Sequence, residues 1–75
     1  MEVLFNKNGF RLVEKQSEIE HQDEKGYYIT ICIVHEIQKK FRFRWRTIKT
    51  YEAYINREAY NNKRKATTLY NLLIK

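Results

Sequence analysis

The sequence predicts an α+β domain, in which a three- or four-stranded antiparallel meander is followed by one or two C-terminal helices packed on one face. Residues 27–37 and 41–46 alternate between two kinds of side chain with the period of a β-strand. The Asn8-Gly9 pair between two apolar segments is typical of a hairpin turn. From Thr47 onward the apolar spacing changes to three or four residues, which indicates a helix.

Size and composition favour one small, folded, basic domain covering residues 1–75. The 75 residues include 43% hydrophobic and 15% aromatic side chains, too many for a disordered chain. The single cysteine, Cys32, excludes an internal disulfide and is expected to be buried. The N-terminus does not resemble a secretory signal, and the longest apolar run, residues 27–34, is too short to cross a bilayer. We therefore expect a cytoplasmic protein with no membrane partner.

The first predicted element is a hairpin with strands at residues 3–5 and 10–13 and a turn at residues 6–9. Residues 14–25 are mostly polar, so the second strand either frays or continues as an exposed edge. Gly26 is the expected turn residue before the third strand.

The third and fourth strands are predicted at residues 27–37 and 41–46, joined by a Gln38-Lys39-Lys40 loop. The expected core side of the third strand consists of Tyr27, Ile29, Ile31, Ile33 and Ile37. In the fourth strand, alternation places three aromatic side chains in the core and three arginines on the opposite face: Phe41, Phe43 and Trp45 against Arg42, Arg44 and Arg46. The face away from the helices is then the basic one.

Only an odd-to-odd register joins the apolar sides of these two strands. The expected partners are Ile37 with Phe41, His35 with Phe43 and Ile33 with Trp45, and this register also sets Glu36 opposite Arg42 as an ion pair. The loop contains no residue suited to a positive φ angle, so the register is provisional.

An amphipathic helix is expected from about residue 49, capped by Thr47 or Thr50. The polar run at residues 61–65 favours a break near Asn61 and a second helix after it. One unbroken helix over residues 49–75 would be about 40 Å long, and its end would project from the sheet and favour a homodimer over a monomer.

Charge distribution gives the best indication of function. Residues 1–37 carry a net charge of −3, whereas residues 38–75 carry +9. We therefore predict a small regulatory or accessory protein that binds nucleic acid, most readily duplex DNA, through the arginine face of the fourth strand. The predicted binding residues are Arg42, Arg44, Arg46, Lys39, Lys40, Lys63, Arg64 and Lys65.

Three alternatives stay open for the same residues. The arginines can be an ordinary solvated strand face, and the aromatics of residues 41–45 can stack on unpaired bases instead of forming core. The protein can also be a phage-type inhibitor or adaptor that docks on an acidic partner protein, with Tyr54, Tyr60 and Tyr70 at the interface.

No pattern of catalytic, metal-binding or cofactor-binding residues occurs in the sequence, so we expect no enzyme activity and no cofactor. His21 and His35 are interpreted as surface and core-edge residues. With two glycines in the chain, a phosphate-binding loop is not expected.

In the order of its elements, residues 26–60 resemble the sheet-type DNA-binding domains of phage and transposon integrases, in which strands lie in the major groove. The resemblance rests on an Arg-rich strand followed by a helix. It contains no motif, so it implies no role for an individual residue.

Overall fold

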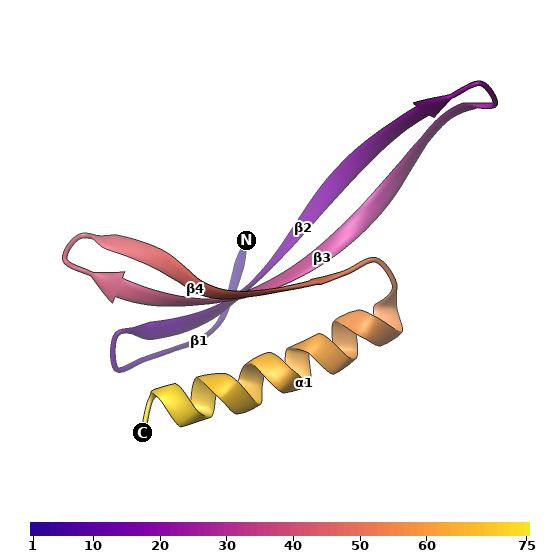
Figure 1. Ribbon diagram of the computed structural model, residues 1–75. Coiled ribbons are helices and arrows are strands. Elements are labelled where there is room, and N and C mark those ends of the chain that lie inside the picture. Colours follow the sequence, from indigo (N-terminus) through magenta and orange to yellow (C-terminus); the bar gives the residue numbers. More distant parts are fainter.

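The computed structural model describes residues 1–75 as one sheet and one helix (Figure 1). The strands are β1 (Glu2–Lys7), β2 (Phe10–Asp23), β3 (Gly26–Phe41) and β4 (Arg44–Ala53), and the helix is α1 (Asn56–Leu73). Neighbouring strands are antiparallel and follow chain order across the sheet. The predicted four-stranded meander with a C-terminal helix on one face is therefore confirmed.

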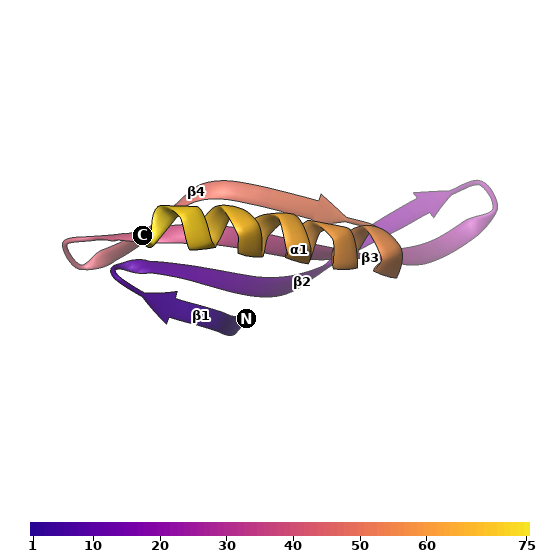
Figure 2. The same ribbon diagram turned by 90° about the horizontal axis from the view of Figure 1, so that it is seen from below.

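The strands differ in length, and this difference shapes the molecule. β1 pairs with β2 only as far as Glu14, and β4 pairs with β3 only from Ile33. Residues 17–32 therefore continue as a two-stranded projection, here called the ribbon, which α1 leaves uncovered (Figures 1 and 2). With the ribbon, the molecule extends over 50 × 28 × 16 Å.

The core lies between α1 and the four-stranded part of the sheet. Leu12 and Ile37, which are cross-strand partners, are fully buried against Ala66 and Tyr70 of the helix. The Tyr70 ring stacks on Phe5 at 5.9 Å, and its hydroxyl donates a hydrogen bond of 3.0 Å to a backbone carbonyl of β2. Burial raises the pKa of Tyr70 above its usual value, so this hydroxyl stays a donor.

The first hairpin forms where the sequence predicts it. Asn8 and Gly9 both have positive φ, 56° and 79°, as a two-residue turn of type I′ requires. β2 then continues through the polar residues 14–23, which confirms the second of the two expectations for this segment. Gly26 begins β3 with a φ of 136°, a conformation that L side chains rarely adopt.

The predicted loop at residues 38–40 is wrong. β3 runs on to Phe41, and the chain turns at Arg42 and Phe43. Residues 38–41 thereby pair with residues of β4, whereas the predicted loop would have left their backbone groups unpaired. The turn instead places Arg42 at a φ of 58°, a conformation uncommon for a residue other than glycine.

The predicted register between the third and fourth strands is wrong for the same reason. Ile37 pairs with Lys49, and Phe41 pairs with Arg44. The expected ion pair between Glu36 and Arg42 does not form. Glu36 instead lies 2.9 Å from the ammonium group of Lys15, because β2 and not β4 places a cation beside it.

The predicted core side is only partly correct. Ile37 is buried, but Tyr27, Ile29 and Ile31 are about half exposed because they lie in the ribbon, beyond the reach of the helix. Of the three aromatics expected in the core, Phe41 and Phe43 are exposed and Trp45 is half-buried.

The helix begins later than predicted. Residues 47–53 belong to β4, where β-branched and aromatic side chains pair with β3. Neither Thr47 nor Thr50 caps the helix, since Ile55 occupies that position without a side-chain hydrogen bond.

The predicted break near Asn61 is also wrong, because α1 is one helix of 18 residues. Ala59 and Ala66 are both buried, and their spacing of seven residues is close to two helical turns. Between them, Asn62 donates a hydrogen bond of 3.0 Å to the backbone carbonyl of Glu52, so the polar run is compatible with a continuous helix. At about 27 Å, α1 lies along the sheet and has no projecting end.

Candidate nucleic-acid interface

At one end of the sheet, the turn between β1 and β2 lies beside the C-terminal end of α1, and the hairpin of β3 and β4 extends past it (Figure 1). The backbone nitrogen of Lys40 donates a hydrogen bond of 2.7 Å to the carbonyl of Gly9, which joins the second hairpin to the first turn. The side chain of Asn8 donates a hydrogen bond of 2.7 Å to the carbonyl of Ile74 just beyond the helix. These hydrogen bonds bring together three segments that lie far apart in the sequence.

The same end concentrates positive charge. Residues 6–11 and 37–50 include no aspartate or glutamate, and they contribute eight cations, here called the basic end: Lys7, Arg11, Lys39, Lys40, Arg42, Arg44, Arg46 and Lys49. The two ion pairs in the structure, Lys15–Glu36 and His35–Glu14, use none of these residues. One carboxylate, that of Glu36, lies beside this end and accepts hydrogen bonds from Gln38 and Thr47, but its ion pair is with Lys15.

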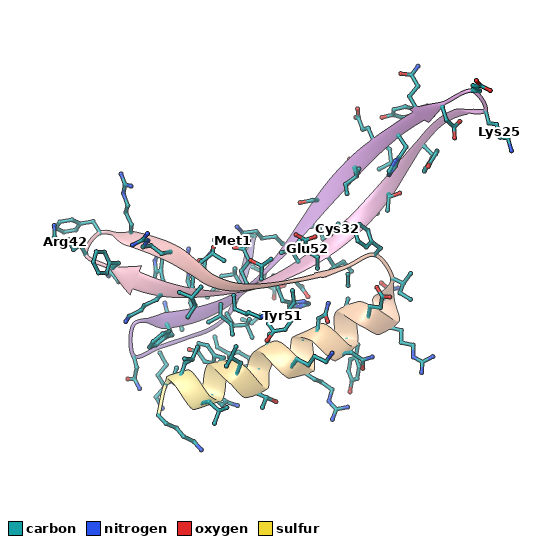
Figure 3. All side chains as sticks on the ribbon, viewed as in Figure 1. Met1, Lys25, Cys32, Arg42, Tyr51 and Glu52 are labelled. Carbon is teal, nitrogen blue, oxygen red and sulfur yellow. The ribbon has the colours of Figure 1, made fainter.

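The arginines do not form the straight row that the sequence predicted. Arg44 pairs with Phe41 and Arg46 pairs with Lys39, so these arginines project from one face of the hairpin. Arg42 lies in the turn at the tip (Figure 3). The row of three is thus replaced by two arginines on a strand and a third at its end.

The position of the arginine face relative to the helix is also opposite to the prediction. Lys39, the partner of Arg46, pairs on its other side with Phe10, which packs against the core under α1. Arg44 and Arg46 are consequently on the helix side of the sheet. They are nevertheless exposed, because the hairpin extends past the end of the helix (Figure 1).

Aromatic rings hold several of these cations in place. The guanidinium of Arg11 lies 4.3 Å from the Trp45 ring and donates a hydrogen bond of 2.6 Å to Gln38 on the face opposite the helix. On the helix side, Arg46 lies 5.8 Å from the ring of Phe41. Cations stacked on rings lose less freedom when they bind an anion, which favours binding.

Phe43 has no such partner. Its side chain is 100% exposed at the tip, between Arg42 and Arg44. A hollow of about 520 Å³ lies here, lined by the six residues from Phe41 to Arg46. Phe41, which is about half exposed, lines the same hollow, so the basic tip carries exposed apolar surface of the kind found at contact sites.

The second predicted cluster, Lys63, Arg64 and Lys65, does not join the basic end. These side chains are exposed on the middle of α1, about 15 Å along the helix axis from its C-terminal end. Three cations of the basic end, Lys7, Arg11 and Lys49, were not predicted from the sequence. The Asn8-Gly9 turn is the signal that places the first two at this end, once β2 is known to lie beside β3.

Comparison with known proteins adds no relative. No protein-family model, no curated protein and no solved structure matches this chain. The function is therefore inferred from the geometry and charge of the chain itself.

The residues considered for metal or catalytic roles lie apart from one another. His35 is buried and lies 3.0 Å from a carboxylate oxygen of Glu14, while His21 stacks on Tyr28 in the ribbon at 4.6 Å. Cys32 is buried at the inner end of the ribbon. No group of three His, Cys, Asp or Glu side chains is arranged to hold a metal ion. The structure also has no helix whose length and apolar character would let it span a membrane.

Proposed function

We propose that the protein binds nucleic acid through the basic end, with duplex DNA as the preferred ligand. The observation that carries this proposal is the concentration of eight cations, none of them in an ion pair, at the end of the sheet where the ring of Phe43 is exposed. A polyanion is the ligand class that such a surface attracts most strongly.

The parts of the basic end have different roles in this proposal. Arg44 and Arg46 donate hydrogen bonds to phosphates, for which the planar guanidinium group is suited. The tip with Arg42 and Phe43 enters a groove, because a two-stranded hairpin fits the major groove of B-DNA. The ring of Phe43 then contacts base edges, as apolar side chains do with the methyl group of thymine in this groove.

The end of α1 opposes this attraction only weakly. The C-terminus of a helix carries about half a negative charge, and it lies beside the turn of Asn8. Eight cations outweigh that partial charge, so the net potential of this end stays positive.

The test is a salt titration of the purified protein against fluorescent duplex DNA, single-stranded DNA and RNA. We expect binding to the duplex that weakens as salt rises, and the log-log slope should decrease by about 0.9 for each phosphate that a variant no longer neutralises. The triple variant Arg42→Gln, Arg44→Gln, Arg46→Gln should lose most of this affinity.

The helix supplies a matched control. The triple variant Lys63→Gln, Arg64→Gln, Lys65→Gln removes the same three charges from the net +6 but leaves the basic end intact. It should bind DNA with a slope close to that of the parent protein. Equal decreases in affinity in both triple variants would mean that net charge alone attracts the DNA, and the proposed interface would be wrong.

A Phe43→Ala variant measures how much the exposed ring contributes to binding. Removal of the ring should weaken binding to nucleic acid with little change in the salt slope, because the contact of the ring with the bases is apolar and releases no counterion. If none of the three nucleic acids binds at low salt, the second candidate function, docking on an acidic protein, takes precedence. In that case Tyr70 contributes nothing to the interface, because it is buried; Tyr54 and Tyr60 are exposed.

A further inference from the structure

The ribbon has two free edges. Along β2, pairing with β1 extends no further than Glu14. Along β3, pairing with β4 begins only at Ile33. Residues 17–23 and 26–32 therefore pair only with each other, through seven cross-strand pairs over about 23 Å. A two-stranded hairpin without a core is marginally stable in water, so pairing with a further strand would stabilise a projection of this length.

The two edges differ in charge. The β2 edge carries Glu18, Glu20 and Asp23, and Glu24 follows in the turn. The β3 edge has no charged residue from Gly26 to Val34 and contains neither proline nor lysine, the residues that commonly protect an exposed strand. Two β2 edges would repel each other, whereas two β3 edges would not.

The β3 edge also exposes apolar surface. Tyr27, Ile29 and Ile31 share one face of the strand, and between 47% and 59% of each residue is exposed. Tyr54 and Ile55, which follow the end of β4 beside Ile33, are exposed as well. Aromatic and β-branched residues at alternate positions are the side chains that stabilise pairing between strands.

From these observations we infer that two copies of the chain associate through their β3 edges, as an antiparallel pair centred on Ile29. In this register Ile29 lies opposite its own copy and Tyr27 lies opposite Ile31, so the apolar residues of both chains share one face. Antiparallel pairing about a two-fold axis is self-complementary, which is the requirement for a closed dimer. The four-stranded bodies then lie at opposite ends of one continuous sheet.

The first test measures the mass of the protein in solution by sedimentation or light scattering. The parent chain should have twice its 9.3 kDa mass. Ile29→Lys should give a monomer, because it places two like charges opposite each other at the two-fold axis. Ile19→Lys is the matched control: Ile19 is an exposed ribbon residue on β2, and this variant should stay dimeric. A monomeric parent protein, or equal weakening of the dimer in both variants, would overturn the inference.

The second test fixes the register by cross-linking in a Cys32→Ala background. Ile29→Cys should form an intermolecular disulfide under mild oxidation, because antiparallel partners have Cβ atoms about 5 Å apart. Glu20→Cys, on the cross-strand partner of Ile29 in the same chain, should not. Cross-linking through position 20 at the same rate would contradict pairing through β3. Both tests are independent of nucleic acid, so they can fail or succeed separately from the proposed function.

Discussion

At the scale of single residues, Glu36 is a carboxyl group whose pKa is changed more by its hydrogen-bond partners than by burial. Desolvation by itself raises the pKa of this carboxyl group. The pKa is lowered by hydrogen bonds from Lys15, Gln38 and Thr47 and by the positive charge of Lys15. These effects exceed that of burial, so the pKa of Glu36 lies below its ordinary value of 4.5. The ionised form of Glu36 therefore stabilises the fold.

The sign of this effect predicts a pH dependence. Because the pKa is lower in the folded state than in the unfolded state, the stabilisation is present above pH 4.5 and is lost as the pH falls through the folded-state pKa. Glu36→Gln should lower the free energy of unfolding at neutral pH, and the difference from the parent should shrink in acid. Urea unfolding at several pH values measures this, with Glu24→Gln, an exposed turn residue, as the control. A difference that is constant with pH would contradict the assigned role.

At the scale of elements, strong local signals were predicted well and continuous patterns were not. The first hairpin follows from Asn-Gly, which by itself demands a turn. The polar run Gln38-Lys39-Lys40 interrupts the alternation and resembles a loop, but pairing with β4 keeps it in β3 and moves the turn to Arg42 and Phe43. The start of α1 was missed because Ile48, Tyr51 and Ile55 fit helical spacing, while pairing with β3 keeps residues 47–53 in the sheet. This is a case in which tertiary contacts override local spacing.

The candidate site was predicted only in part, because its geometry depends on the position of the turn between β3 and β4. Five of its cations were identified from the basic stretch at residues 39–46, but their arrangement changed when the turn moved to Arg42. Lys7 and Arg11 could not be included, because it is the pairing of β2 with β3 and the hydrogen bond from Lys40 to Gly9 that place the first turn beside this part of β3. The exposure of Phe43 follows from its position in the turn, so the sequence alone could not predict it either.

The turn itself predicts a conflict between stability and binding. Arg42 has a φ of 58°, which glycine adopts without steric cost. Arg42→Gly should therefore raise the free energy of unfolding by about 0.5–1 kcal/mol while weakening DNA binding, because it removes a cation. Arg44→Gln, which removes a cation from a regular strand position, should weaken binding without stabilising the protein. Denaturant unfolding and the DNA titration, measured on both variants, check this, and destabilisation by Arg42→Gly would contradict the assigned strain.

At the scale of the whole molecule, stability should be divided between the body and the ribbon. Leu12 and Ile37 are fully buried under α1, whereas the ribbon has hardly any buried side chains. Amides of the body should exchange with solvent only on global unfolding, and amides of the ribbon should exchange through local opening at a lower free energy.

Hydrogen exchange followed by NMR at several protein concentrations measures this division. Protection of residues 26–32 should rise with concentration, because pairing between two chains covers that edge, while protection of Leu12 and Ile37 should be unchanged. The monomeric Ile29→Lys variant is the control. If its ribbon amides were protected as strongly as those of the body, the predicted difference in stability between ribbon and body would be wrong.

Arg42 and Lys25 mark opposite extremities of the molecule, one at the basic end and the other at the tip of the acidic ribbon (Figure 3). Such a molecule is an electric dipole, and the field of a nearby polyanion would orient it before contact. In the proposed complex, the basic pole faces the polymer and the acidic pole points into solution. Each bound molecule would thus hold its uncharged β3 edge clear of the surface, free to meet another.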